Sequence, residues 1–150
     1  MAGTFSRLLY HVVFSTKSRT RFIDPKLRTE LYPYMGGIIR RQGGWLLSLG
    51  GMPDHVHILL RLKPDVAIAE LVRHVKGGSS KWVHEQKGLC PDFAWQTGYA
   101  AFSVSESKEA TVRSYIERQE AHHRRTTFED ELLTLLRKHN VEFDPVHVFD

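Results

Sequence analysis

The sequence has little cysteine, no long apolar run and no repeated segment. Its one cysteine, Cys90, excludes an internal disulfide and lacks the partners that a zinc finger or a redox pair requires. No stretch approaches the roughly 18 apolar residues of a membrane span, and the first residues do not follow the pattern of a secretory signal. Low-complexity tracts and interdomain linkers are absent as well. We therefore expect one cytoplasmic domain over residues 1–150 that has no membrane partner.

The composition is that of a globular domain with an uneven distribution of charge. Apolar residues make up 41% of the chain and charged residues 25%, both typical values. The net charge is +4, yet residues 1–50 carry 8 basic and 2 acidic side chains, whereas residues 101–150 carry 7 and 10. The first third of the chain is therefore the part that we expect to face phosphate groups.

Hydrophobic periodicity predicts four strands, over residues 8–15, 45–49, 55–62 and 99–104. Helices are expected after caps at Asp24, Asp65, Ser107 and Thr126, and the glycine pair at residues 77–78 is expected to interrupt the second helix. The order βαββαβ is that of the ferredoxin-like or RRM-like fold. We therefore predict an α+β protein with an antiparallel sheet, helices on one face and additional C-terminal helices. The first and third strands are central neighbours in this arrangement.

Two histidines, His55 and His57, flank one hydrophobic residue at the start of the third predicted strand. Alternate residues of a strand point to the same face, so both imidazoles can reach one metal ion while Val56 faces the core. A random shuffle of this composition gives about half an occurrence of the pattern. Taken alone, the pair is therefore better explained as two polar rings on a strand surface.

A second pair, Tyr115 and Gln119, is four residues apart on a predicted helix and shares one face of it. A hydroxyl and an amide oxygen can thus approach the same point. Two histidines, an amide oxygen and a tyrosine are the components of a metal-assisted phosphodiester transesterase.

The chain resembles the HUH-type single-tyrosine transposases of small bacterial insertion sequences that move as single-stranded DNA (TnpA-like). HUH stands for histidine, hydrophobic residue, histidine. The matching segments follow the order of the family and cover nearly the whole chain, from about residue 8 to 123, with a C-terminal helical extension over about 126–150. They are residues 10–17 (YHVVFSTK), 50–57 (GGMPDHVH), 71–77 (LVRHVKG), 79–82 (SSKW) and 115–120 (YIERQE).

The resemblance implies a DNA transposase that cuts and rejoins single-stranded DNA near hairpin ends through a 5′-phosphotyrosine. It implies Tyr115 as the nucleophile, a Mg²⁺ or Mn²⁺ ion held by His55, His57 and Gln119, and a homodimer as the assembly. The sequence itself identifies no general base for Tyr115. It also does not distinguish a site within one chain from a site shared between subunits.

Several basic residues are candidates for DNA contacts in this context. Lys17, Arg19 and Arg21 alternate in a polar loop directly after the first strand, and Lys76 precedes the glycine pair. The stretch at residues 122–125 (HHRR) either binds phosphate or is an exposed helix end. Asp54 either orients one of the histidines or only forms a turn.

Two other functions fit the same pattern. A domesticated transposase that acts on repeated genomic hairpins would have the same catalytic residues. A non-catalytic RRM-like nucleic-acid-binding module would instead present stacking aromatics, which Tyr10 and Phe14 could supply on the first strand. The third strand has histidines and aliphatic residues where such a module has aromatics, which counts against this second alternative.

Overall fold

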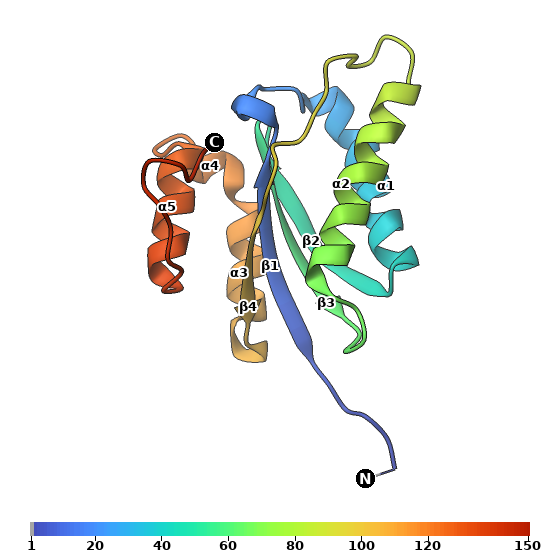
Figure 1. Ribbon diagram of the computed structural model, residues 1–150, viewed down its shortest axis with the longest axis vertical. Coiled ribbons are helices and arrows are strands. Elements are labelled where there is room, and N and C mark those ends of the chain that lie inside the picture. The colour runs from blue at the N-terminus through green and yellow to red at the C-terminus, as the bar shows by residue number, and fades with distance from the viewer. Residues whose placement is uncertain (1) are drawn as a thin grey trace.

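A four-stranded antiparallel sheet forms the centre of the molecule. The computed structural model describes residues 2–150, with strands β1 (Leu8–Ser15), β2 (Gly44–Met52), β3 (His55–Leu62) and β4 (Ala100–Val104). Their order across the sheet is β2-β3-β1-β4, so β1 and β3 are central neighbours, as the sequence predicts (Figure 1). β3 has its predicted bounds, and β2 is longer than predicted at both ends. Since a central strand is hydrogen-bonded on both sides, β3 is a rigid support for the residues that it carries.

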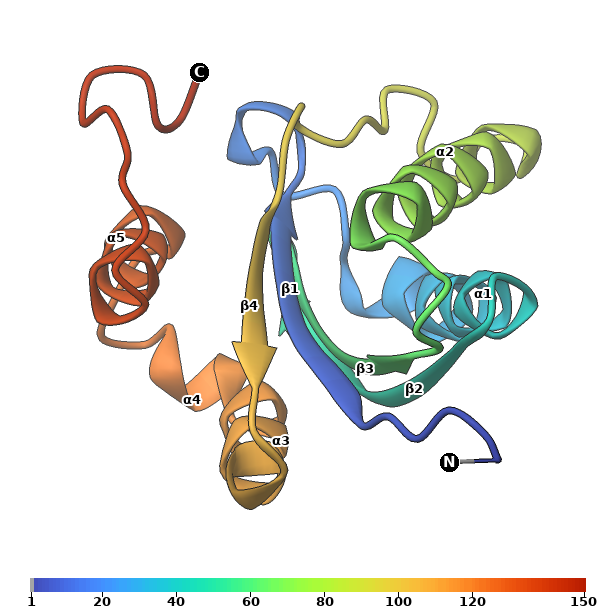
Figure 2. The ribbon, with the colours of Figure 1, turned by 60° about the horizontal axis from the view of Figure 1, so that its bottom comes forward.

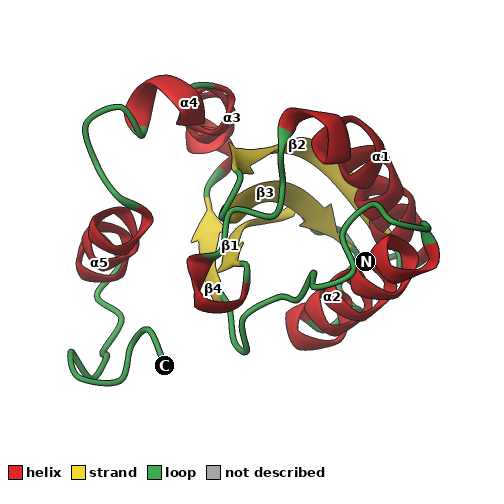
Figure 3. Ribbon diagram, turned by 90° about the horizontal axis from the view of Figure 1, so that it is seen from above, coloured by secondary structure: helices red, strands yellow, loops and turns green. Residues whose placement is uncertain are grey.

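Helices cover both faces of this sheet. α1 (Pro25–Arg41) and α2 (Ile68–Glu85) lie on one side, as Figure 2 shows. α3 (Glu109–Glu117), α4 (Gln119–His122) and α5 (Phe128–Lys138) lie on the other side (Figure 3). This arrangement confirms the predicted α+β fold with additional C-terminal helices. No helix in the described part of the chain is both long and apolar enough to cross a membrane.

Alternate residues of β1 pack into two separate cores. Val12 and Phe14 join the larger core beneath α1 and α2, whereas Val13 belongs to a smaller core on the opposite face. The smaller core is completed by one residue of β4 and three of α5: Phe102, Phe128, Leu135 and Leu136. The C-terminal helix therefore packs on the sheet of its own chain.

α2 departs from the sequence prediction in two ways. It begins at Ile68, later than the predicted cap at Asp65 implies, and no side chain caps its first turn. It also continues through the glycine pair at residues 77–78, so the predicted interruption is wrong. A Cβ atom at Gly78 would lie 2.9 Å from Cδ1 of Ile38 in α1. This glycine therefore permits close packing of two helices and does not end one.

The caps of α3 and α5 each lie one residue after their predicted positions. α3 follows a short 3₁₀ turn, and its N-cap residue is Lys108 rather than Ser107. At α5, the side chain of Thr127 rather than Thr126 accepts a hydrogen bond from the backbone N–H of Asp130. Two neighbouring threonines have the same intrinsic capping ability, so the local sequence does not decide between them.

Candidate active site

The two histidines of β3 point away from α1 and α2, into a site closed by α3, α4 and α5. Their neighbours Val56 and Ile58 face the larger core, as the alternation of a strand requires. His55 and His57 are both completely buried, and the centroids of their rings lie 5.1 Å apart. The predicted convergence of the two imidazoles is therefore present.

Each of these histidines has a partner at its Nδ1 atom. His55 Nδ1 lies 2.7 Å from Oδ1 of Asp54, so Asp54 has the orienting position that was one of its two predicted roles. His57 Nδ1 lies 2.8 Å from Nε2 of His11 on β1, a residue for which the sequence suggests no role. Such partners fix the orientation of a histidine that binds a metal through its other nitrogen. Both Nε2 atoms face the interior of the site.

A carboxylate from α5 lies at the centre of the site. Glu131 is only 3% exposed, and its Oε1 atom lies 2.9 Å from Nε2 of His57 and 3.3 Å from Nε2 of His55. His123, which follows α4, places its Nε2 atom 3.1 Å from the same oxygen. One donor atom from each of the four residues lies within 4.8 Å of all the others, so the cluster could hold a metal ion.

The predicted ligand Gln119 is buried at the start of α4. Its Oε1 atom lies 3.0 Å from Nε2 of His55 and 2.9 Å from Nε2 of His123, and its Nε2 atom donates to Oε2 of Glu131 at 2.9 Å. The amide oxygen, which is the atom able to bind a metal ion, thus faces the histidines. The structure brings His55, His57 and Gln119 together.

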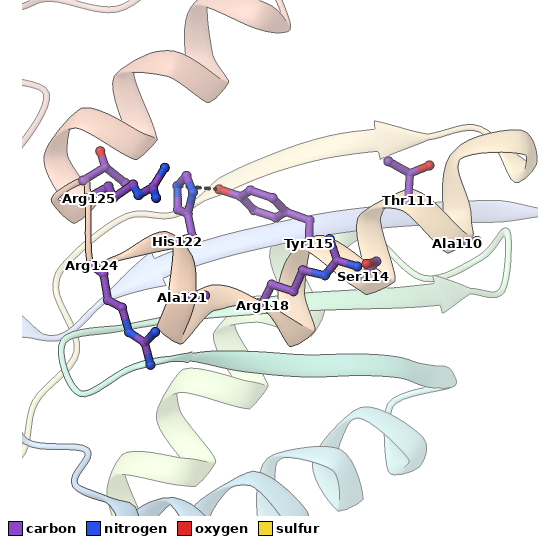
Figure 4. A pocket seen from close by; sticks show the side chains of 10 residues that line it. Ala110, Thr111, Ser114, Tyr115, Arg118, Ala121, His122, Arg124 and Arg125 are labelled. Carbon is purple, nitrogen blue, oxygen red and sulfur yellow. Dashed lines mark hydrogen bonds between the residues drawn. The ribbon is translucent and has the colours of Figure 1, made fainter.

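Tyr115 reaches the same cluster from α3. Because α3 ends at Glu117 and Gln119 begins α4, the single predicted helix that carries both residues is wrong. The hydroxyl of Tyr115 donates a short hydrogen bond to Oε2 of Glu131. The hydroxyl oxygen also lies 3.5 Å from Nε2 of His122, as the dashed line in Figure 4 marks. Burial and the nearby carboxylate of Glu131 raise the pKa of Tyr115, because both favour the neutral phenol. The predicted nucleophile therefore lies beside the predicted metal ligands in its protonated form.

Opposite charges balance each other inside this buried cluster. Burial by itself would raise the pKa of Glu131, but hydrogen bonds from three histidines hold that pKa well below its usual range. Burial would likewise lower the pKa of His55, but hydrogen bonds to two carboxylates raise it to about 9. Burial lowers the pKa of His57, and it lowers the pKa of His11 to about 3. Without a metal ion the cluster therefore favours an ionised Glu131 and a protonated His55, and a metal ion bound at Nε2 of His55 would displace that proton.

The sequence does not predict Glu131 at all, and it predicts His123 only as part of the 122–125 stretch considered for phosphate binding, not as a metal ligand. A signal for Glu131 is nevertheless present in α5. It lies three residues after Phe128 and four before Leu135, and both of those side chains are buried in the smaller core. An acidic residue at an apolar-face position of an amphipathic helix is unusual and would have marked Glu131 as a candidate. His123 gives no comparable signal, because it follows the last turn of a four-residue helix.

The four cations predicted to contact DNA have different surroundings. Arg19 forms an ion pair with Glu129 at 2.6 Å, and Lys76 donates hydrogen bonds to two backbone carbonyl oxygens. The donors of these two side chains are used within the protein. Lys17 and Arg21 are exposed, and neither forms an ion pair with another described residue. Contact with DNA stays a prediction for all four.

A family model described as "Transposase IS200 like" matches residues 4–119 of this chain. The chain belongs to this family. The matched range of the IS200-like transposases contains His55, His57, Tyr115 and Gln119. It ends before His123 and Glu131, so these two donors lie outside the part that the family model describes.

Similar proteins agree with this assignment to the IS200-like transposases. The ISDra2 transposase TnpA of Deinococcus radiodurans is 29% identical over 122 residues, which cover 78% of this chain and 87% of the relative. The transposase for insertion sequence element IS200 of Salmonella typhimurium is 30% identical over 130 residues, which cover 79% and 81%.

Two solved structures share the fold. A putative transposase from Deinococcus radiodurans superposes with a TM-score of 0.63 at 28% identity, and the match covers 79% of this chain and 95% of that one. A REP-associated tyrosine transposase bound to a REP hairpin superposes with a TM-score of 0.62 at 13% identity, covering 82% and 74%. At that low identity the second similarity concerns the fold alone.

Proposed function

We propose that this protein cuts and rejoins single-stranded DNA near hairpin ends in a metal-dependent reaction, with Tyr115 as the nucleophile. One observation carries the proposal: a single carboxylate, Glu131, contacts both the hydroxyl of Tyr115 and the Nε2 atom of His57. The nucleophile and the metal donors are therefore separated by no more than one small anionic group. A scissile phosphate must bridge the same separation.

The residues present fit a divalent metal ion. Three imidazole nitrogens and one carboxylate oxygen lie within 4.8 Å of one another. We infer that His55, His57 and Gln119 would hold Mn²⁺ or Mg²⁺, with Glu131 and His123 as further ligands. Imidazole nitrogen suits transition metals better than Mg²⁺, so we expect Mn²⁺ to bind more tightly. A bound ion supplies polarisation of the scissile phosphate and neutralises negative charge in the transition state.

Tyr115 performs the covalent chemistry in this proposal. Its oxygen forms a bond to phosphorus, the bond between phosphorus and the 3′ oxygen breaks, and the products are a 5′-phosphotyrosine and a 3′-hydroxyl. The phenol loses one proton and the departing 3′ oxygen gains one. The hydrogen bond to Glu131 holds the phenol neutral before attack, and the carboxylate that accepts this bond is within reach to take the proton as the oxygen attacks. Since the phosphotyrosine retains the energy of the diester, a second 3′-hydroxyl can reverse the reaction and rejoin the strand.

Hairpin-containing single-stranded DNA is the proposed partner, because a protein of the same fold has been solved with a REP hairpin. A homodimer and a cytoplasmic location are proposed from the family resemblance alone. Tyr115, Glu131 and the three histidines of the candidate metal site meet within one chain. A single chain can therefore supply both the tyrosine and the metal donors.

The structure does not favour a non-catalytic module of the RRM type. Phe14 is 2% exposed, and both it and Tyr10 belong to the larger core on the side of α1 and α2. The opposite face of the sheet is covered by α3 and α5. Neither face therefore presents the open aromatic platform on which such modules stack bases.

The test is cleavage of single-stranded DNA that carries the hairpin end of the parent insertion sequence, with Mn²⁺ present. Wild-type protein should produce cut strands and a covalent protein–DNA adduct that survives denaturing electrophoresis. Tyr115→Phe removes one oxygen atom, so folding and DNA binding should change little while the adduct disappears. Tyr99→Phe, at a tyrosine that is 41% exposed and lies outside the cluster, is the matched control and should behave as wild type. Cleavage by folded Tyr115→Phe protein at the wild-type rate would show that the tyrosine mechanism is wrong.

A further inference from the structure

A cavity of about 1050 Å³ opens beside the candidate nucleophile, and His55, His57 and His123 are not among the residues that line it. We call it the arginine pocket, and its walls come from α3, α4 and the segment after α4. Figure 4 shows Tyr115 in one wall with its hydroxyl directed toward His122. The side chains of Arg118 and Arg125 lie near this pair, and that of Arg124 extends away from it. The lining residues are Ala110, Thr111, Ser114, Tyr115, Arg118, Ala121, His122, Arg124, Arg125 and Thr126.

The three arginines of this pocket lack acidic partners. Arg118, Arg124 and Arg125 are exposed, and none forms an ion pair with any residue between 2 and 150. Four other arginines each pair with a glutamate (Arg7, Arg19, Arg73 and Arg113), and six more form no ion pair among the described residues (Arg21, Arg28, Arg40, Arg41, Arg61 and Arg137). What distinguishes the pocket is that three unpaired arginines line one cavity. The pocket therefore concentrates positive charge that the protein itself leaves unbalanced.

The acidic residues of the same segment lie elsewhere. Glu117 and Glu120 alternate with the arginines along α3 and α4, yet both line a different cavity, next to Gly50 and Gly51 of β2. The cations and the acidic residues of α3, α4 and the residues after them thus line two different cavities, and Tyr115 lines the cavity that holds the cations. Like charges held close together repel each other, and a polyanionic ligand removes this cost.

We propose that the arginine pocket binds the single strand adjoining the scissile phosphate, with Arg118, Arg124 and Arg125 contacting neighbouring backbone phosphates. Guanidinium groups form paired, charge-assisted hydrogen bonds to phosphate oxygens. The pocket is as large as the upper end of the range for ligand sites, about 300–1,000 Å³, and so has room for nucleotides rather than one small ion. Small side chains such as Ala110 and Ala121 leave that room free. This inference rests on the proposed function, because it assumes that DNA must reach Tyr115.

The test measures binding rather than cleavage. Fluorescein-labelled (dT)20 is titrated with protein in EDTA, and affinity is followed by anisotropy over a range of salt concentrations. The triple variant Arg118→Gln/Arg124→Gln/Arg125→Gln should bind at least tenfold more weakly. Its salt dependence should fall by about 2 in slope, since each lost contact to a single-strand phosphate removes about 0.7. The control is Arg73→Gln/Lys81→Gln/Lys87→Gln, which removes three exposed charges from α2 and the residues after it and should change affinity less than twofold.

Position is tested separately, by photo-crosslinking a strand that contains 5-iodouracil and sequencing the crosslinked peptide. Crosslinks should map to residues 110–126. Circular dichroism checks folding, and Arg124→Gln/Arg125→Gln replaces the triple variant if the triple variant does not fold. Equal weakening by the pocket variant and the control, or crosslinks only outside residues 110–126, would overturn the proposal. If the wild-type protein forms no adduct but the pocket variant still loses (dT)20 binding, the proposed function is refuted and the binding site stands. If the wild-type protein forms the adduct but the pocket variant binds (dT)20 as tightly as the wild type, the binding site is refuted and the proposed function stands.

Discussion

At the scale of single residues, Glu131 links the chemistry of the site to its stability. Its carboxylate is buried, and it is balanced by contacts to His55, His57 and His123. A buried charge whose partners are removed is strongly destabilising, by about 3–5 kcal/mol. The same residue therefore keeps the histidines in place and holds Tyr115 neutral.

Replacing Glu131 should alter stability in a pH-dependent way. The pKa of His55 is raised to about 9 in the folded protein. A raised pKa contributes stability that is fully present below the unfolded value, near 6.5, and is lost as the pH rises through 9. Glu131→Gln removes one cause of this shift, so it should lower the free energy of unfolding by about 3 kcal/mol at pH 6.5 and by less at pH 9.5. Urea denaturation of metal-free protein at both values measures the difference.

His74→Ala, at a partly exposed side chain of α2 outside the buried cluster, is the control for this experiment and should show no such dependence. NMR titration measures the pKa of the His55 imidazole directly. In wild-type protein His55 should titrate near pH 9, and in Glu131→Gln it should titrate lower. A His55 pKa at or below 6.5 in the wild type would contradict this account of the buried cluster.

How far the sequence predicts the site depends on how far each residue is from its partners along the chain. His55 and His57 follow from strand alternation, and Gln119 follows from its place four residues after Tyr115 in a family motif. His11 acts through the pairing of β1 with β3, in which Val13 lies opposite His57. The sequence around His11 or His57 does not by itself predict how β1 and β3 align. The contact between His11 and His57 therefore appears only in three dimensions.

At the scale of elements, α5 both completes the site and closes the second core. Phe128, at its first turn, is 5% exposed and lies with its ring centroid 4.6 Å from that of His55. Leu135 and Leu136 pack in the same core against Val13 of β1 and Phe102 of β4. The position of Glu131 is thus fixed by apolar contacts on both sides of it along the helix.

Phe128→Ala should therefore weaken the whole site through packing. Truncation of a buried phenylalanine costs about 3–5 kcal/mol, and urea denaturation should show a loss of this size. Val146→Ala, at a side chain that is 77% exposed, is the matched control and should change stability by less than about 0.5 kcal/mol. A loss below about 1 kcal/mol for Phe128→Ala would mean that α5 is not anchored as described.

The elements themselves were predictable where one periodicity dominates. β3 has its predicted bounds because its apolar run begins directly after a turn sequence. α2 was harder to predict, because glycine is usually a helix breaker in sequence but here serves a contact with Ile38. That contact depends on how α1 and α2 pack against each other, which the sequence of either helix alone does not predict.

At the scale of the whole molecule, the sheet separates the larger hydrophobic core from the candidate active site. One face packs against α1 and α2 and forms the larger core. The other face carries the histidines and is covered by the helices that bring Tyr115, Gln119 and Glu131. Chain segments from residue 11 to residue 131 thus meet at one point. The family match covers residues 4–119 and therefore ends before α5.

The central claim is that Tyr115 becomes covalently joined to the 5′ phosphate of cut DNA, and end-labelled substrates test it most directly. Two copies of the hairpin-end strand of the parent insertion sequence, one labelled at its 3′ end and one at its 5′ end, are incubated with protein and Mn²⁺ and separated under denaturing conditions. The account predicts that the 3′ label migrates with the protein and that the 5′ label is released on a fragment with a free 3′-hydroxyl. It further predicts that mass spectrometry of the digested adduct finds the nucleotide on Tyr115. An adduct that retains the 5′ label, a nucleotide on another residue, or cleavage without any adduct would contradict it.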